Sequence, residues 1–200
     1  GAGSDEDVAA GAYLIYESSD LYMNLSESDI KFHDGELDEV TGYSVSSAGD
    51  FNRDGYSDII IGALGASNYE GIRTGAAYLI YGPITNTNYY VPDANIKFTG
   101  ENQSDQAGSS VALAGDVNRD GYDDILIGSR FNAEGGTKAG AVYLIYGSNI
   151  NDLEISLANA DAKFIGEYAS WAGKSISSAG DVNGDGYNDI LIGAPYNASG

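Results

Sequence analysis

Cysteine is absent from this 200-residue sequence, which excludes disulfide bonds, thiol catalysis and thiolate metal sites. Lysine and arginine together number only 9 against 30 acidic residues. The resulting net charge of -21 excludes nucleic acid as a partner, because its phosphates would be repelled. No apolar run approaches the roughly 18–20 residues of a membrane span, and no signal peptide is visible. Membrane insertion is therefore not expected.

Proline occurs 3 times, whereas glycine occurs 28 times and tyrosine 16 times. This balance is typical of many short strands joined by tight turns. No stretch of convincing length shows a helical period. Two hundred residues are sufficient for one substantial domain with a real core. The composition therefore favours an all-β fold.

Internal repetition at about 65 residues organises the chain. The sequence Asp-X-Asn-X-Asp-Gly begins at Asp50, Asp116 and Asp181, which are 66 and 65 residues apart. One unit contains four predicted strands. The first is rich in small residues, the second is rich in Ile, the third is rich in Tyr, and the fourth contains a Lys-Phe pair. The Ile-rich strands are 59–61, 125–127 and 190–192, the Tyr-rich strands are 12–16, 77–81 and 142–146, and the Lys-Phe strands are 30–32, 96–98 and 162–164.

Four antiparallel strands in a repeat of this length predict a β-propeller blade. Small residues suit the crowded strand nearest the central channel, and the middle strands are apolar on both faces because each blade lies between two neighbours. The sequence therefore predicts that the chain forms a single propeller, or a segment of one, with about three blades. Two blade units comprise residues 41–98 and 107–164, and a split, strand-exchanged blade combines 172–200 with 1–32.

Each repeat also carries a nine-residue loop that places oxygen-bearing side chains at positions 1, 3, 5 and 9, with Gly at position 6. Calcium takes about 6–8 hard oxygen ligands, and a curled loop can supply most of them when a backbone carbonyl at position 7 is included. The Gly allows the sharp bend that a Cβ would obstruct. The sequence therefore predicts three calcium sites, with the ligands Asp50, Asn52, Asp54, Tyr56, Asp58; Asp116, Asn118, Asp120, Tyr122, Asp124; and Asp181, Asn183, Asp185, Tyr187, Asp189.

Two other interpretations of these loops are possible. An EF-hand requires a bidentate Glu at position 12 and flanking helices, whereas position 12 is Ile61, Ile127 and Ile192 and a predicted strand follows each loop. A metal loop within a β-hairpin fits better. The other alternative is an ordinary Asp/Asn/Gly turn without a metal, which three copies in register disfavour.

Calcium is expected to have a structural role, because it neutralises clustered carboxylates that otherwise repel one another. Arg53 and Arg119, at loop position 4, are expected to point outward and to temper this negative charge. Millimolar calcium outside cells would fill weak sites of this kind. The chain is therefore expected to be extracellular or at the cell surface.

The third copy of the motif, residues 178–195, resembles the FG-GAP repeat of the integrin alpha-subunit propeller and its prokaryotic relatives. The resemblance extends over nearly the whole chain and implies a calcium-binding propeller. Two departures weaken an integrin-type ligand site. The Gly-Ala-Pro is complete only at 193–195, and the Phe of "FG" is replaced by Thr41, Ala107 and Ala172.

Three blades are too few to close a ring, since propellers have 4–8. We expect two chains to complete each other's split blade in a six-bladed C2 dimer, unless the chain is part of a longer propeller. The resemblance implies that ligands approach the face opposite the calcium loops. Trp171 lies in one loop of that face and could bind a sugar or a protein partner, or simply pack between blades.

We interpret the protein as a non-catalytic, calcium-binding module for extracellular adhesion, protein–protein interaction or assembly, with a protein or glycan ligand. No carboxylate pair outside the loops can be nominated for catalysis. The alternative is a lectin-like carbohydrate-binding propeller or one of the polysaccharide-lyase type. The lyase requires a basic channel, for which nine basic residues are a poor supply.

Overall fold

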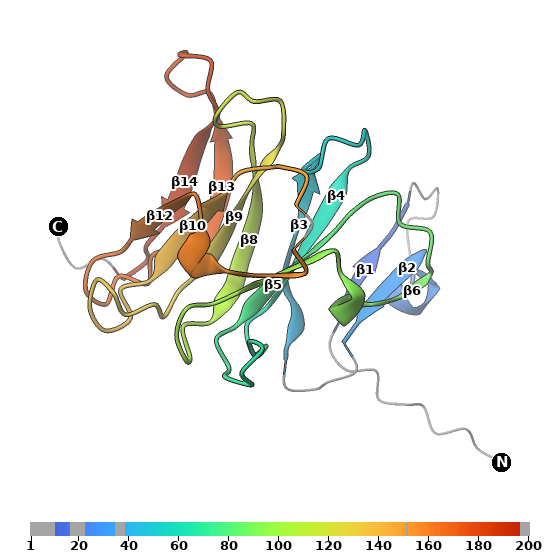
Figure 1. Ribbon diagram of the computed structural model, residues 1–200, viewed down its shortest axis with the longest axis horizontal. Helices are drawn as coiled ribbons and strands as arrows, with labels where there is room; N and C mark the ends of the chain where they lie inside the picture. Colours follow the sequence, from blue (N-terminus) through green and yellow to red (C-terminus); the bar gives the residue numbers. More distant parts are fainter. Residues whose placement is uncertain (1–10, 17–22, 35–38, 151, 197–200) are drawn as a thin grey trace.

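The computed structural model describes residues 11–16, 23–34, 39–150 and 152–196. These residues form an all-β structure of propeller blades that lie side by side like a fan (Figure 1). The described part contains three short 3-10 turns and no α-helix. None of its helical segments is long and apolar enough to cross a membrane.

Two blades have all four predicted strands, in the predicted antiparallel order. In both, the small-residue strand lies at one edge, the Ile-rich and Tyr-rich strands lie in the middle, and the Lys-Phe strand follows. The first blade comprises β3 (Thr41–Gly49), β4 (Asp58–Ala63), β5 (Ala76–Ile80) and β7 (Ile96–Thr99), and the second comprises β8 (Ala107–Gly115), β9 (Asp124–Ser129), β10 (Ala141–Ile145) and β12 (Ala162–Ile165).

The remaining strands form two separate half-blades. β1 (Gly11–Leu14) pairs with β2 (Ile30–His33), and β13 (Ser175–Gly180) pairs with β14 (Asp189–Gly193). The two pairs lie at opposite ends of the fan (Figure 1). The split blade that joins them therefore stays a prediction, and parts of its predicted unit, residues 1–10, 17–22 and 197–200, lie outside the described residues.

Two further strands escaped the sequence reasoning. β6 (Asn88–Tyr90) pairs in parallel with β2, and β11 (Glu154–Ser156) pairs in parallel with β7. Each lies in the connection between a Tyr-rich and a Lys-Phe strand and adds to the outer edge of the preceding blade. A 3-10 turn follows each of them, η2 (Val91–Asp93) and η3 (Leu157–Asn159), and a third, η1 (Leu25–Glu27), precedes β2. These strands cover edges that otherwise expose unpaired backbone groups.

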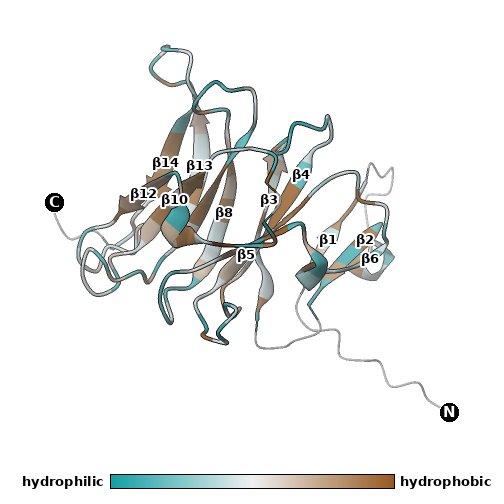
Figure 2. Cartoon of the chain, in the orientation of Figure 1, coloured by the Kyte–Doolittle hydropathy of each residue, from teal (hydrophilic) through white to brown (hydrophobic). Residues whose placement is uncertain are grey.

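The core lies between the blades. Three apolar clusters fill the interfaces between successive sheets, and the middle strands contribute to the clusters on both of their faces. Every residue of β5, β9 and β10 is buried, and these strands are brown in Figure 2 while the loops at their ends are teal. Full burial of one such Ile or Leu side chain stabilises the fold by roughly 1.5–3 kcal/mol. The middle strands are continuous apolar runs, without alternation of polar and apolar residues, because each blade is packed between two neighbouring blades.

The edge strands β3, β8 and β13 contact one another in succession. Glycine also permits a close approach between β8 and β5 at Gly108, where an added Cβ would lie 2.0 Å from the carbonyl oxygen of Ala76 in the preceding blade. Gly108 also has a φ of +75°, a left-handed conformation that glycine adopts readily. Gly42 and Gly173 occupy the equivalent positions with φ of +84° and +80°. The glycine that follows the substituted Phe is therefore a blade-packing residue.

Candidate metal sites

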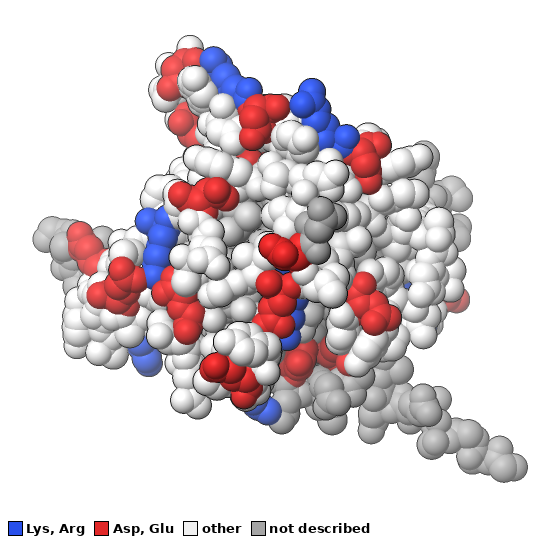
Figure 3. Space-filling model, in the orientation of Figure 1, with Lys and Arg blue, Asp and Glu red and all other residues white. Residues whose placement is uncertain are grey.

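The three predicted metal loops lie at one edge of the fan, between β3 and β4, β8 and β9, and β13 and β14 (Figure 1). Acidic and basic side chains alternate along this edge, at the top of Figure 3. The glycine at position 6 has a φ of +91° in Gly55, +89° in Gly121 and +86° in Gly186. All three loops thus bend in the left-handed conformation that the sequence predicts at this position.

The side chains at positions 1, 3 and 5 come together in each loop. In the first loop, the backbone N–H of Asp54 donates to Oδ1 of Asp50 at 2.9 Å and to Oδ1 of Asn52 at 3.0 Å. Asn52 Nδ2 in turn donates to Oδ2 of Asp54 at 2.9 Å. The same three contacts join Asp116, Asn118 and Asp120 in the second loop, and Asp185 N donates to both Asp181 and Asn183 in the third.

The aspartate at position 9 has a different environment. Asp58 is buried at the start of β4, where Oδ2 accepts a hydrogen bond from Phe51 N and Oδ1 accepts one from Gly82 N, both at 2.9 Å. Asp124 is bound in the same way by Val117 N and Gly147 N, both at 2.8 Å. Burial raises the pKa of both carboxyl groups against these hydrogen bonds, that of Asp124 to about 6. Position 9 therefore fastens the first two loops to their blades, whereas Asp189 of the third loop accepts a hydrogen bond only from Val182 N among the described contacts.

No described hydrogen bond joins the position-9 carboxylates to the side chains at positions 1, 3 and 5. Within the described part of the chain, no group of three Asp, Glu, His or Cys side chains has the spacing of a metal site. At position 7, the recorded contact is made by the backbone N–H, which donates to the aspartate at position 5 in each loop, as in Tyr56 N to Asp54 Oδ1 at 2.9 Å.

The donor set nevertheless fits a hard cation. Two carboxylates and one amide oxygen converge in each loop, and all are oxygen donors of the type that calcium prefers. No described ion pair neutralises these carboxylates. Asp50, Asn52 and Asp54, with their counterparts, are the residues that would hold the ion, which would supply charge neutralisation and no reaction chemistry.

The expectation that Arg53 and Arg119 point outward is wrong. Each side chain extends to the metal loop of the next blade. Arg119 Nε donates to the carbonyl oxygen of Gly186 at 2.7 Å, and Nη2 donates to that of Asp185 at 2.9 Å. Its guanidinium carbon lies 3.9 Å from the centre of the Tyr187 ring. Arg53 makes longer contacts with the second loop, 3.5 Å to the Asp120 carbonyl and 5.5 Å to the Tyr122 ring. The arginines therefore connect the loops of successive blades.

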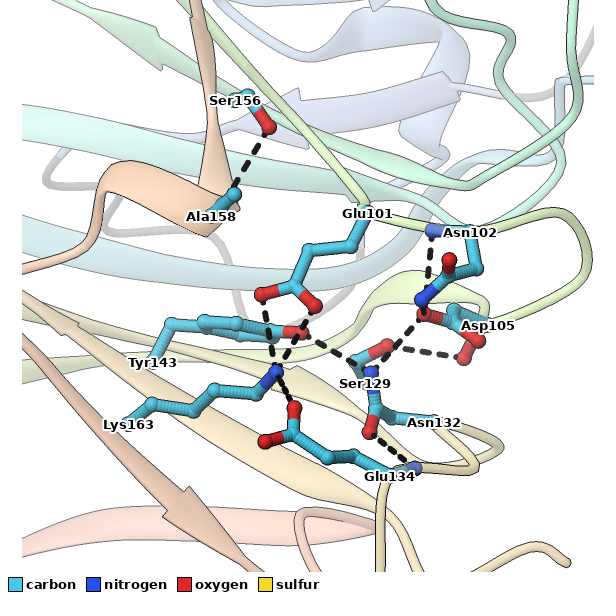
Figure 4. Close-up of polar contacts among 10 residues, drawn as sticks. All are labelled: Glu101, Asn102, Asp105, Ser129, Asn132, Glu134, Tyr143, Ser156, Ala158 and Lys163. Atoms are coloured by element: carbon cyan, nitrogen blue, oxygen red, sulfur yellow. Dashed lines mark hydrogen bonds and ion pairs between the residues drawn. The ribbon is translucent and has the colours of Figure 1, made fainter.

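A second polar cluster lies between the two complete blades at the other edge. Lys163 of β12 forms ion pairs with Glu101, at 2.8 Å, and with Glu134 (Figure 4). Its ammonium also lies 5.3 Å from the ring centre of Tyr143, whose hydroxyl accepts a hydrogen bond from Asn132 Nδ2. Burial, followed by the nearby Glu101, raises the pKa of Tyr143. The lysine charge is thus fully neutralised, as in a structural ion pair.

Asp105 extends this cluster. It is buried, and its Oδ2 accepts hydrogen bonds from Asn102 N, Asn102 Nδ2 and Asn132 Nδ2 at 3.2, 3.2 and 3.0 Å (Figure 4). Burial raises the pKa of the carboxyl group, and the amide hydrogen bonds oppose this shift. Sequence reasoning missed Glu101, Asp105 and Lys163 as a group, because Glu101 and Asp105 lie in the connection between β7 and β8 whereas Lys163 lies in β12, far along the chain.

Trp171 packs between aromatic neighbours. Its ring centre lies 5.0 Å from that of Phe131 and 4.6 Å from that of Tyr196, in edge-on contacts. The packing interpretation of this residue is therefore confirmed.

The model of the FG-GAP repeat matches residues 41–80, 107–145 and 172–200, which together exceed half of the sequence. The chain belongs to the FG-GAP repeat family. Each matched segment begins at or just before the strand that precedes a metal loop and extends beyond the loop, and the first two segments cover the first three strands of a blade.

Known proteins with similar sequences share this FG-GAP region. Integrin alpha-PS5 of Drosophila melanogaster is 32% identical over 167 residues, which cover 82% of this chain and 16% of the integrin. Integrin alpha pat-2 of Caenorhabditis elegans is 32% identical over 207 residues, which cover 94% of this chain and 16% of that integrin. Phosphatidylinositol-glycan-specific phospholipase D of Bos taurus is 34% identical over 168 residues, which cover 80% of this chain and 19% of the phospholipase. The FG-GAP chain thus spans less than a fifth of the length of these relatives.

Proposed function

We propose that this chain is a non-catalytic, calcium-binding propeller module that serves extracellular adhesion or protein–protein association. The single observation that carries the proposal is the convergence of positions 1, 3 and 5 in three equivalent loops at one edge of the blades. The donors are all oxygen, and the loops are exposed to solvent. Calcium outside cells is abundant enough to fill sites of moderate affinity.

The comparisons include both an association module and an enzyme. Two of the three relatives described are integrin alpha subunits, whereas the third is named as a phospholipase, so similarity alone leaves both classes open. The polar cluster at Lys163 supports the non-catalytic assignment. Two glutamates neutralise its ammonium, and a general base requires a free amine.

Calorimetric titration with calcium tests the proposal. We expect three binding sites per chain, and we expect the single substitutions Asp54→Ala, Asp120→Ala and Asp185→Ala each to remove one of them. A triple variant should bind no calcium. Lys31→Gln is a control that alters the charge away from the loops. An unchanged stoichiometry in the three single variants would contradict the proposal.

Completion of the half-blades is the assembly part of the proposal. By analogy with β9 and β10, where Ile127 pairs with Tyr143, β14 of one copy should pair with β1 of another so that Ile192 lies opposite Tyr13. Two such contacts give a C2 dimer of six blades. The alternative partner of these edges is the remainder of a longer propeller.

Light scattering distinguishes these states for this chain. We expect a mass of twice 20.9 kDa in calcium. Cysteines introduced together at positions 191 and 14, which the same register places opposite each other, should crosslink between chains. A monomeric mass with no crosslink contradicts the dimer and leaves the calcium proposal unaffected.

A further inference from the structure

Three of the nine basic side chains surround one aromatic cluster at the edge opposite the metal loops. The cationic–aromatic patch comprises Arg130, Phe131, Lys138, Trp171, Lys174 and Tyr196. These residues come from the connection between β9 and β10, the connection between β12 and β13, and the segment after β14. Backbone hydrogen bonds fix the segments relative to one another, including Trp171 N to the Lys138 carbonyl at 3.1 Å and Tyr196 N to that of Ser170 at 3.2 Å.

The rings hold the three cations close together. Lys138 Nζ lies 5.1 Å from the centre of Phe131 and 5.5 Å from that of Trp171, and Lys174 Nζ lies 5.4 Å from the centres of both Trp171 and Tyr196. The guanidinium carbon of Arg130 lies 5.0 Å from Phe131. Attraction to the ring faces partly offsets the repulsion among the like charges.

No ion pair with a carboxylate of the described residues neutralises the patch. Among the described residues, ion pairs are recorded for Lys163 and none for Arg130, Lys138 or Lys174. Both lysines of the patch are exposed. In a chain with 30 acidic and 9 basic residues, three basic side chains around one aromatic cluster, none of them in a described ion pair, are a local concentration of positive charge.

Arg130 is held in place by neutral groups. Its Nε donates to Oε1 of Gln106 and its Nη1 donates to the hydroxyl of Tyr43, both at 2.8 Å. A guanidinium carries five N–H donors, so three are left for another acceptor. Because its orientation is already fixed, a carboxylate can bind to the remaining donors at a low entropic cost.

We propose that the cationic–aromatic patch binds an acidic segment of a protein partner. Carboxylates of the segment contact Arg130, Lys138 and Lys174, and apolar side chains beside them pack on Phe131 and Tyr196. The inference rests on the proposed function as an association module, and it names the site and the charge of the partner.

The contacts that the aromatic rings of the patch already make favour a peptide over an acidic glycan as the ligand. The Trp171 ring already contacts Phe131 and Tyr196, and the ammonium groups of Lys138 and Lys174 lie 5.5 and 5.4 Å from its centre, so side chains of this chain compete with a stacked sugar for the largest ring. Trp, Tyr and Arg gathered in one patch are typical of energetic hot spots between proteins. The uniform charge of the patch provides selectivity for an acidic partner.

Fluorescence anisotropy tests the assignment with a labelled peptide of alternating Glu and Leu, its Gln counterpart, and oligogalacturonate as the acidic glycan. We expect the Glu peptide to bind and the Gln peptide to bind at least tenfold more weakly. Arg130→Gln and the double substitution of Lys138 and Lys174 by Gln should each weaken Glu-peptide binding about tenfold. Lys31→Gln, a charge-matched change in β2, should leave binding unchanged.

Equal binding of the Glu and Gln peptides, or undiminished binding by the patch variants, would overturn the proposal. Binding of oligogalacturonate in preference to the Glu peptide would also overturn it, in favour of a glycan site. Calcium titration of the same variants separates this test from that of the proposed function. The patch variants should retain all three calcium sites, because they lie at the opposite edge of the blades.

Discussion

The Nε of Arg119 donates a hydrogen bond of 2.7 Å to the carbonyl oxygen of Gly186, so a side chain in the second metal loop supports the backbone of the third. The close approach depends on glycine, since a Cβ at position 186 would lie 1.5 Å from Nη2 of Arg119. Gly186 therefore has two functions, to allow the bend and to admit the arginine of the preceding blade.

Removal of this arginine should lower stability through the contact between loops. We expect Arg119→Ala to lower the melting temperature by about 2–4 °C, because it loses two hydrogen bonds from a charged donor in an exposed setting. Arg53→Ala is the matched control. Its contact with Asp120 is longer, 3.5 Å, so its effect should be smaller. Calorimetric scans of the two variants check the order, and a larger effect of Arg53→Ala would contradict it.

Removal of calcium should destabilise the chain. If each loop brings carboxylates together as the structure shows, the ion offsets their repulsion and binds the folded state selectively. We expect excess EDTA to lower the melting temperature by several degrees. The triple variant of Asp54, Asp120 and Asp185 to Ala should show no such shift. An unchanged melting temperature of the wild type in EDTA would contradict the calcium assignment.

The sequence was sufficient to predict the four-strand blade, because its repeat fixes both strand order and the positions of the loops. It did not predict β6 and β11, since three-residue strands carry too few side chains to show a pattern. Their pairing depends on the neighbouring blade that lies beside them. The outer edge of a blade is therefore a tertiary property.

The same limit applies to the sites. The convergence of Asp50, Asn52 and Asp54 is local, and alternate positions in one loop predict it. By contrast, Glu101 and Lys163 are 62 residues apart and meet only because two blades pack. The reach of Arg119 into the next loop was missed for the same reason, as it depends on the distance between blades. Sequence reasoning thus predicts contacts within a repeat and misses those between repeats.

Lys163 should be important for the interface between the two complete blades. Its replacement by Met leaves Glu101, whose side chain is 17% exposed, without a cation, and we expect a loss of about 2 kcal/mol in the free energy of unfolding. Glu134→Gln should cost less, because the Glu134 side chain is 53% exposed and Glu101 still pairs with the lysine. Urea denaturation at constant m value gives both differences, and equal costs would contradict this interpretation.

Asp105 should make stability depend on pH. Because its pKa is raised by burial in the folded state, the folded protein binds this proton more readily than the unfolded chain. The cost of burying the charge is complete above the folded pKa and is relieved as pH falls toward 3.8, the ordinary value. We therefore expect the wild type to gain stability relative to Asp105→Asn as the pH falls from neutral toward 3.8. Urea unfolding at several pH values measures the difference, and a constant difference would contradict the assignment.

Gly108 should tolerate no side chain. Alanine there combines a positive φ with a Cβ only 2.0 Å from the Ala76 carbonyl oxygen, so two blades must separate to admit it. We expect Gly108→Ala to cost more than about 3 kcal/mol. Gly55→Ala is the matched control, because Gly55 has a φ of +91° but no atom within 4 Å of an added Cβ. It should cost only about 1 kcal/mol, the penalty of the backbone conformation alone. Denaturation of both variants in urea separates the cost of the steric clash from that of the backbone conformation. Similar costs for the two variants would mean that the blades do not meet at Gly108.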